Sequence, residues 1–341
     1  MTLHQEEIDV FKNLLEQKQH IAIISHYNPD GDAIGSSLAL ASVLRNEGHT
    51  VTCIVPNKYA YYLNWIPEVE NIIVYANDNE HKAEDAILDA DMLIGIDLTS
   101  FSRAEAVNEI VSLNTTAKRV LIDHHLSPSG TYDVMFSYPE ISSASELAYT
   151  IISAIYGCDV ITKQIATQLY VGIMTDTGNF SYSHLSPDLF SAVSVLSRTG
   201  INIQEIYNNV YNAFTESRAR LMGYVINWKM KLLLNGTVAY MSLSMDEMRK
   251  FWFKQGDSEG FVNYPLTIKK MKMSAFFSEQ DNFIRVSLRS RGNVDVDEFA
   301  RRFFNGGGHM NASGGKSFQS LKDTIKHYID SVEIYHKEGK V

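Results

Sequence analysis

Short apolar runs recur along the first part of the chain, each followed by polar residues. They are rich in β-branched side chains, which is typical of buried strands in a parallel sheet. The runs cover residues 20–25, 50–55, 71–75, 90–96 and 119–122. Between the first two, residues 33–44 combine small and apolar side chains, which predicts a helix packed closely on the sheet and ended by Gly48. A strand, a helix and a second strand in this order predict a βαβ unit.

From Ser143 onward the apolar residues recur at helical spacing instead. Helices are predicted over 144–157, 163–175, 187–199, 203–211 and 215–230, in addition to an N-terminal helix over 5–18. Beyond residue 232, strands are predicted over 238–243, 271–277 and 283–288, with a hairpin turn at 279–282 and a final helix over 320–335.

This pattern predicts an α/β fold with two parts. An N-terminal, mostly parallel sheet flanked by helices is linked by a helix to a smaller α+β C-terminal domain. We expect the boundaries at 1–214, 215–231 for the helical linker, and 232–341. A length of 341 residues with 45% apolar residues supports more than one domain.

The formal net charge of −10 argues against a protein that binds long nucleic acid through a broad basic face. A small phosphorylated substrate stays compatible with this charge, because bound divalent cations would add positive charge. Cys53 and Cys158 are the only cysteines, so a thiolate-rich zinc or iron–sulfur site is excluded.

The first residues lack the basic region and apolar core of a signal peptide, and no apolar run is long enough to span a membrane. We therefore expect a cytoplasmic protein with no membrane partner, a location that is compatible with free thiols.

Acidic and histidine residues follow the apolar runs, and in open α/β sheets ligands bind beyond the carboxyl ends of the strands. Residues 171–174 form one more apolar run, but they lie within a helical pattern, so the element that precedes Asp176 stays open. The candidate ligands are His26, Asp30, Asp32, Asp97, His124 and Asp176, with Asp123 and His125 beside them.

Each cluster taken alone has an ordinary structural explanation. Asp30-Gly31-Asp32, for example, is typical of a turn that caps a helix. Four such clusters at one edge of a sheet favour a single metal site instead. Carboxylates mixed with imidazoles suit Mn²⁺ best, with Mg²⁺ or Co²⁺ as alternatives, and a pair of such ions is the usual arrangement for hydrolysing phosphate esters.

These motifs resemble the DHH phosphoesterases. Asp123-His124-His125 resembles the signature of that family, and the segments that contain His26 to Asp32, Asp97, and Gly172 to Gly178 resemble its other motifs. The glycine-rich segment 306–315 resembles the substrate loop of the DHH-associated C-terminal domain. The resemblance covers roughly residues 15–335 and is strongest to the bacterial oligoribonuclease and pAp phosphatase branch.

The resemblance implies a role for each residue. Asp97 would bridge two ions, His125 would face the phosphate or orient the site, and Asp123 would fix a histidine. One ion would be held by His26, Asp30 and Asp97, and the other by Asp32, Asp97, His124 and Asp176.

Substrate residues are expected in both domains, with the substrate in a cleft between them. Arg285, Arg289 and Arg291 alternate, which predicts that they share one strand face. Arg289 is the preferred phosphate ligand, although charged residues also protect strand edges. The other candidates are Arg103, Gly307, Gly308, His309 and Asn311, where the glycines would offer backbone N–H donors.

The resemblance implies Mn²⁺-dependent hydrolysis of very short RNA oligonucleotides, removal of the 3′-phosphate of 3′-phosphoadenosine 5′-phosphate (pAp), or both. Alternatives are a cyclic or linear dinucleotide phosphodiesterase, an inorganic pyrophosphatase, and a non-catalytic nucleotide sensor that uses metal only to bind. The oligomeric state stays open, with a homodimer among the expectations.

Overall fold

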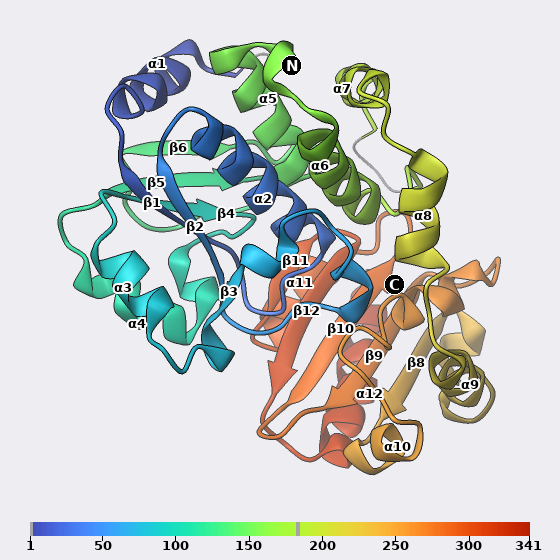
Figure 1. The fold of residues 1–341 in the computed structure, drawn as a ribbon. Coiled ribbons are helices and arrows are strands. Elements are labelled where there is room, and N and C mark those ends of the chain that lie inside the picture. Colours follow the sequence, from blue (N-terminus) through green and yellow to red (C-terminus); the bar gives the residue numbers. More distant parts are fainter. Residues whose placement is uncertain (1–2, 182–184) are drawn as a thin grey trace. The chain divides into compact units, whose positions relative to one another are not determined.

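The computed structural model of the protein describes residues 3–181 and 185–341 (Figure 1). Its contacts divide the chain into two compact units, Met1–Ala213 and Phe214–Val341. Each unit contains one six-stranded sheet.

The first unit is built on a fully parallel sheet with the strand order β3-β2-β1-β4-β5-β6. The order runs outward in both directions from β1 and β4, so the carboxyl ends of these two strands form the topological switch point where open α/β sheets bind ligands. The strands are β1 (His20–Ile24), β2 (Thr50–Val55), β3 (Ile73–Val74), β4 (Met92–Ile96), β5 (Lys118–Asp123) and β6 (Val134–Ser137).

Helices cover both faces of this sheet (Figure 1). One face packs against α1 (Gln5–Leu14), α2 (Gly31–Asn46), α5 (Ala144–Tyr156) and α6 (Lys163–Asp176). The other face packs against α3 (Lys82–Leu88) and α4 (Ala106–Leu113). Two further helices, α7 (Pro187–Arg198) and α8 (Ile203–Tyr211), complete the unit.

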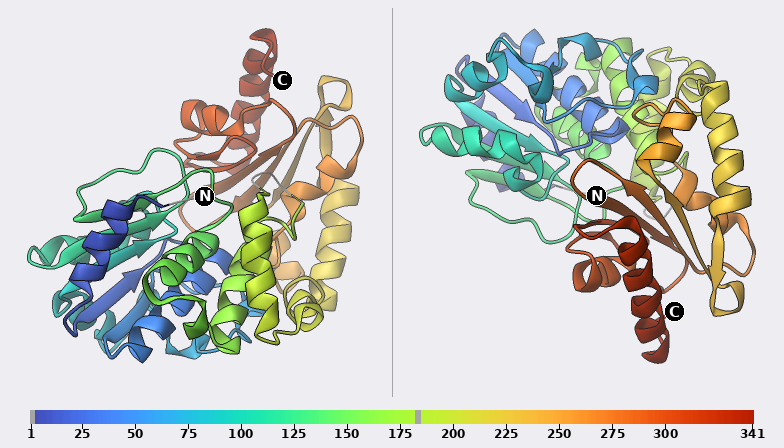
Figure 2. Two further views of the ribbon diagram at one scale, coloured as in Figure 1. Left: turned by 90° about the horizontal axis from the view of Figure 1, so that it is seen from above. Right: turned by 90° about the horizontal axis from the view of Figure 1, so that it is seen from below.

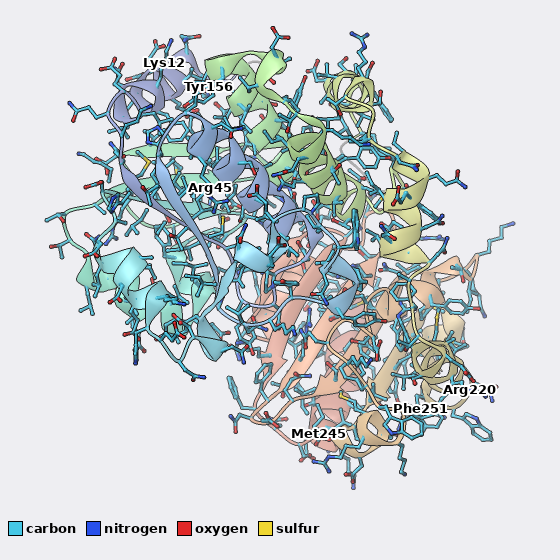
Figure 3. All side chains as sticks on the ribbon, in the orientation of Figure 1. Lys12, Arg45, Tyr156, Arg220, Met245 and Phe251 are labelled. Atoms are coloured by element: carbon cyan, nitrogen blue, oxygen red, sulfur yellow. The ribbon has the colours of Figure 1, made fainter. Side chains whose placement is uncertain are left out.

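The small residues of α2 allow a close approach to α6. A Cβ atom on Gly35 would lie 2.4 Å from the carbonyl oxygen of Gln168, so only glycine fits there. At the far end of α2, Arg45 donates to the Val51 carbonyl oxygen and forms an ion pair with Glu68 at 2.9 Å (Figure 3). The helix that begins at Gly31 is thereby fixed at both ends.

The second unit contains a mixed sheet with the order β11-β12-β10-β9-β8-β7, in which only β8 and β9 pair in parallel. One face packs against α11 (Val296–Phe303) and the C-terminal helix α12 (Leu321–Lys337), drawn in red in Figure 2. The other packs against α9 (Glu216–Tyr224) and α10 (Met245–Lys250). The strands are β7 (Lys231–Leu233), β8 (Val238–Leu243), β9 (Met273–Glu279), β10 (Ile284–Ser290), β11 (Gly307–His309) and β12 (Ala312–Ser317).

The predicted α/β class, with a parallel sheet followed by a mixed-sheet part, is confirmed. The helix predicted over 163–175 is confirmed as α6, so the apolar run at 171–174 lies within a helix. One local expectation differs from the structure. The glycine-rich segment 306–315 is not an open loop but largely the hairpin of β11 and β12.

Within residues 3–181 and 185–341, no helix combines the length and the apolar character needed to cross a membrane.

Candidate metal centre

His26 and Asp30 lie in the loop that joins β1 to α2. Asp30 is the N-cap residue of α2, and one carboxylate oxygen accepts the backbone N–H groups of Asp32 at 2.9 Å and Ala33 at 3.1 Å. The Nδ1 atom of His26 lies 2.9 Å from the Tyr27 carbonyl oxygen, which directs its Nε2 atom toward Asp97. The capping role considered for Asp30 is therefore real, and it also fixes the position of the residue beside the other acids.

Asp97 follows β4 directly and is buried, with 2% of its surface exposed. Its two carboxylate oxygens face different rings. Oδ2 lies 3.4 Å from Nε2 of His26, and Oδ1 lies 3.6 Å from Nε2 of His124. Asp97 thus stands between the groups contributed by β1 and by β5, as a bridging carboxylate would.

His124 faces three carboxylates at once. Its Nε2 atom lies 3.5 Å from an oxygen of Asp176, 3.6 Å from one of Asp97 and 3.9 Å from one of Asp32. Asp176 is the last residue of α6, which resolves the open question about the element that precedes it. Ligand candidates from the ends of a strand and of two helices therefore meet at this ring.

The Asp32 carboxylate is held by the N-terminus of α5. Its oxygens accept the backbone N–H groups of Ala144 at 2.7 Å and Ser145 at 2.9 Å. The positive end of a helix dipole stabilises a carboxylate in this position. Gly172 makes room for it, because a Cβ atom there would lie 2.7 Å from an Asp32 oxygen.

Asp123 holds His125. Its Oδ1 atom accepts from Nδ1 of the histidine at 2.8 Å, which fixes the ring orientation and places the proton on Nδ1. Asp123 itself is fully buried, and its other oxygen has no hydrogen-bond partner among the described residues. A carboxylate in this position orients the ring beside the acidic cluster.

Burial and mutual repulsion perturb the acids of this cluster. Burial raises the pKa of Asp32 well above its usual value, and the charges of Asp97 and Asp176 raise it further. Burial likewise raises the pKa of Asp176 to about 6. Burial also acts to raise the pKa of Asp97, but the His124 and His26 rings outweigh it and lower that pKa.

The two histidines shift in the complementary direction. Burial acts to lower the pKa of His124, but Asp176 and Asp97 raise it well above the usual value. The pKa of His26 is raised by Asp97 against the effect of burial in the same way. The cluster therefore favours the binding of positive charge.

The donor atoms fit divalent cations. His26, Asp30 and Asp97 each offer a ligand atom within 4.8 Å of the others, and so do Asp32, Asp97 and His124. Asp97 belongs to both groups. Mixed oxygen and imidazole donors suit ions such as Mn²⁺, Fe²⁺ or Zn²⁺.

Arg103 lies near this cluster. It is exposed on the 3₁₀ turn Phe101–Ala104, and its positive charge opposes the rise in the pKa of His26. The backbone carbonyl of Arg103 accepts the N–H of Tyr27 at 2.9 Å, which connects this turn to the loop after β1.

The remaining candidates lie in the second unit. Arg289 is half-buried on β10, and His309 ends β11. The Gly308 N–H donates to Asp297 at 2.6 Å, and the Asn311 amide donates to the Ser290 hydroxyl at 2.8 Å. Two of the expected donors thus also hold the β11–β12 hairpin in place. Arg291 lies just beyond the end of β10, so only Arg285 and Arg289 alternate on the strand itself.

Tight packing explains part of the glycine-rich segment. A Cβ atom on Gly306 would lie 1.9 Å from the Gly314 carbonyl oxygen, and one on Gly315 would lie 2.6 Å from the Phe304 carbonyl oxygen. Larger residues at these positions would separate the hairpin from the chain that precedes it.

A pair of asparagines, which the sequence pattern did not indicate, joins two loops at this edge of the first sheet. The Asn28 N–H donates to the Asn57 side-chain oxygen at 2.6 Å, and the Asn57 amide donates back to the Asn28 oxygen at 2.8 Å. Asn28 lies between His26 and Asp30 and has a positive φ of 59°. An asparagine in a loop was the only available signal, and it was too common to interpret.

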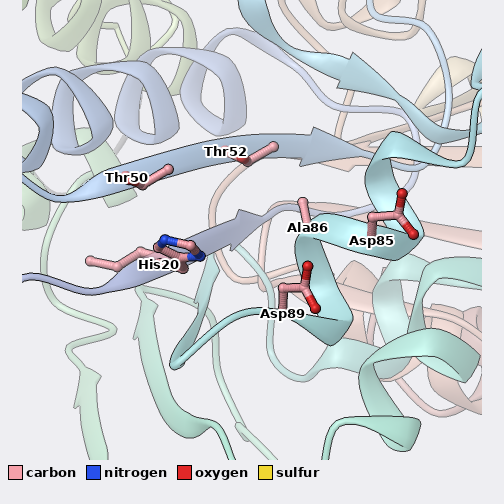
Figure 4. Close-up of a pocket in the computed structure, with 7 residues that line it drawn as sticks. His20, Thr50, Thr52, Asp85, Ala86 and Asp89 are labelled. Carbon is pink, nitrogen blue, oxygen red and sulfur yellow. The ribbon is translucent and has the colours of Figure 1, made fainter.

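A surface hollow in the first unit lies at the opposite end of the strands (Figure 4). It is lined by His20 and Thr50, the first residues of β1 and β2, and by Asp85 and Asp89 of the α3 region. The candidate metal ligands follow the carboxyl ends of these strands, so this hollow is a separate feature.

Two family models match the chain. The model described as "DHH family, N-terminal domain" matches residues 20–173, and the model described as "DHHA1 domain" matches residues 235–333. The first contains all the candidate ligands except Asp176, and the second contains the strands β8 to β12.

Individual relatives match over most of the chain. The chain is 26% identical over 294 residues to a bifunctional oligoribonuclease and PAP phosphatase, NrnA, of Thermus thermophilus, covering 86% of this chain and 83% of the relative. The solved structure of an exopolyphosphatase-related protein from Bacteroides fragilis is 39% identical, with a TM-score of 0.90 and coverage of 98% of this chain and 97% of that one.

RecJ from Thermus thermophilus, solved in complex with Mn²⁺, shares the fold alone, at 10% identity. Its TM-score is 0.53, and the match covers 97% of this chain and 55% of that one. The two family models, together with the relatives that match most of the chain, establish that the chain belongs to the DHH family of phosphoesterases and carries a DHHA1 domain after its DHH domain.

Proposed function

We propose that this phosphoesterase degrades very short RNA oligonucleotides and removes the 3′-phosphate of pAp, using two divalent cations, with Mn²⁺ as the native metal. The relative in Thermus thermophilus, which is named for both activities, supports the substrates. The observation that carries the metal proposal is the position of Asp97, whose carboxylate belongs to two overlapping groups of ligand atoms.

The residues present define two proposed sites. His26, Asp30 and Asp97 would hold one cation, and Asp32, Asp97, His124 and Asp176 would hold the other. Bound there, a pair of divalent cations supplies positive charge to the phosphate and lowers the pKa of water.

The protein groups around this pair would orient the substrate. Asp123 keeps the His125 ring in one tautomer, so that its Nε2 atom is the one proposed to face the phosphate. In the second unit, Arg289 and His309 are proposed to bind phosphate, together with the backbone N–H group of Gly307. Arg103 is proposed to bind phosphate from the first unit. We assign metal binding to residues 1–214 and most of the substrate binding to residues 232–341.

A matrix of metals and substrates tests the proposal. The substrates are pAp, di- and triribonucleotides, linear and cyclic di-adenosine nucleotides, and pyrophosphate, each with Mn²⁺, Mg²⁺, Co²⁺ or EDTA. We expect mononucleotides from RNA and phosphate from pAp, with the highest rate in Mn²⁺ and none in EDTA. Turnover confined to the cyclic di-adenosine nucleotide or to pyrophosphate would contradict the proposed substrates, and intact ligands throughout would indicate a sensor.

Asp97→Ala and Asp89→Ala form a matched pair for the same assay. Both remove one carboxylate from the first unit, but Asp89 is exposed at the amino end of the sheet. We expect Asp97→Ala to abolish Mn²⁺-dependent turnover and Asp89→Ala to leave it unchanged. Equal activity of the two variants would contradict the proposal.

A further inference from the structure

One face of the second sheet carries a row of polar side chains along β10. Arg285, Ser287 and Arg289 are half-buried, whereas Val286 and Leu288 between them are buried in the core beneath α11 and α12. Successive residues of a strand point to opposite faces, so the three polar residues share the face that does not pack on these helices.

The neighbouring strands extend this row into a strip, because directly paired residues on adjacent strands point to the same face. Arg285 pairs with Lys316 of β12, and Arg289 pairs with Ala312. Between them, Ser287 pairs with Gly314. We call these six residues the β10–β12 strip. Arg285 and Lys316 are the cations at one end of the strip, and Arg289 is the cation at the other end. Small side chains lie between them.

The cations of α11 are neutralised by nearby carboxylates. Arg301 forms an ion pair with Asp297, and Arg302 forms one with Glu338, both at 2.8 Å. Among the residues that the structure describes, Arg285 forms no ion pair, and none of the six strip residues is acidic. Lys316 adds a second cation beside Arg285, with its ammonium 4.8 Å from the centre of the Phe283 ring.

The distance between the two ends of the strip separates short substrates from longer ones. Arg285 and Arg289 are four residues apart on an extended strand, which corresponds to about 13 Å. A single ribose separates the two phosphates of pAp, so they span much less than this distance. A 5′-phosphorylated trinucleotide, or a longer chain, has at least three phosphates that span two or more riboses and can reach both ends.

We propose that the β10–β12 strip binds the sugar–phosphate backbone of an oligoribonucleotide and makes Arg285 and Lys316 determinants of substrate length. Arg289 contacts a phosphate that pAp and RNA have in common. Arg285 and Lys316 contact a phosphate that only the longer chain supplies. Guanidinium groups suit phosphate because they donate in pairs, and the small residues Ser287, Gly314 and Ala312 let the backbone approach the sheet. The inference rests on the proposed function.

The test uses the full-length double variant Arg285→Gln/Lys316→Gln, which keeps side chains of similar length without their charge. With Mn²⁺ present, kcat/KM is measured for pAp and for 5′-phosphorylated adenosine oligoribonucleotides of different length. We expect kcat/KM for the trinucleotide to fall about tenfold, mainly through KM, and its dependence on salt to weaken. We expect kcat/KM for pAp to stay within about twofold of the wild type, which also reports that the variant is folded.

The matched control is Lys322→Gln/Lys326→Gln, which removes two exposed cations from α12, on the other face of the sheet. It is expected to hydrolyse both substrates as the wild type does. The inference is overturned if the strip variant hydrolyses the trinucleotide normally, or if it loses pAp and trinucleotide hydrolysis equally. A wild-type protein that hydrolyses neither substrate would overturn the proposed function instead.

Discussion

Asp97 combines an unusual backbone conformation with the central position in the acidic cluster. Its φ of 55° lies in the left-handed region, which aspartate and asparagine tolerate better than most residues. The turn follows β4 directly and is held by a hydrogen bond from the Asp97 N–H to the Ile122 carbonyl oxygen at 3.0 Å. The conformation directs the carboxylate toward the rings of His26 and His124, so the backbone and the proposed chemistry both favour aspartate.

Asp97→Asn separates these two requirements. Asparagine tolerates the same φ but has one oxygen and no charge, so we expect a folded protein whose kcat falls at least about 100-fold. Steady-state kinetics with Mn²⁺ and circular dichroism check the two parts of the prediction. A folded variant with nearly normal turnover would show that Asp97 does not bridge cations.

Asp123→Asn tests the residue that positions His125. The amide no longer favours the present tautomer of the ring, so we expect a 10- to 100-fold loss of kcat and a displaced pH–rate profile. Asp133→Asn is the control, because Asp133 is an exposed carboxylate at the other end of the same strands. A pH–rate profile identical to that of the wild type would argue against a role of Asp123 in orienting the ring.

The perturbed acids predict how metal binding depends on pH. Burial raises the pKa of Asp176 to about 6, so protons occupy this carboxylate as the pH falls below that value, and burial raises the pKa of Asp32 in the same direction. Metal must displace these protons, and apparent Mn²⁺ affinity should therefore decrease from pH 7 to pH 5, with proton release on binding. Calorimetry in two buffers of different ionisation enthalpy measures this release. Affinity that is independent of pH, without proton release, would contradict the prediction.

At the scale of elements, the close packing of α2, α5 and α6 is what brings Asp32 into the cluster. Asp32 enters from α2 and is bound by the N-terminus of α5, and Gly172 of α6 leaves the space for both. The position of one carboxylate therefore depends on three helices that are adjacent only in the folded protein.

Gly172→Ala should disturb this arrangement. The added Cβ atom would lie 1.9 Å from the Ser145 hydroxyl oxygen and 2.7 Å from an Asp32 oxygen. We expect a loss of about 1–3 kcal/mol in the free energy of unfolding and weaker Mn²⁺ binding. Urea denaturation and metal titration measure the two effects.

Gly223→Ala in helix α9 is the matched control, because a Cβ atom there would meet no atom within 4 Å. Helix propensity predicts that this change is neutral or stabilises the protein by up to about 1 kcal/mol. If both alanine variants behaved alike, the packing at Gly172 would not constrain the cluster.

Strands that consist of a short apolar run were predictable from the sequence, whereas glycine-rich strands and very short helices were not. The predicted limits of β2 and β8 agree with the structure, because each strand is a short apolar run bounded by polar or turn residues. The hairpin of β11 and β12 was missed, since its glycines give no alternation of apolar and polar residues. Helix α11 was also missed, although its buried residues Val296, Phe299 and Ala300 share one face, because only eight residues carry this pattern.

At the scale of the whole molecule, parallel topology explains why the sequence could predict which side chains meet. The carboxyl ends of β1, β4 and β5 lie at one edge of the sheet, so His26, Asp97 and His124 converge although they are far apart in the chain. The partners that hold them could not be predicted in this way. The Asn28–Asn57 pair depends on tertiary contacts, and so do the backbone N–H groups that bind Asp32. Such contacts leave no pattern in the sequence.

The central claim is that these side chains hold two cations that share Asp97. Anomalous diffraction near the manganese edge, from crystals grown with Mn²⁺, tests it most directly. We expect two peaks roughly 3.5–4 Å apart, one beside His26 and Asp30 and the other beside Asp32 and His124, with Asp97 between them. A well-ordered cluster without anomalous peaks, or with the metal bound elsewhere, would contradict it.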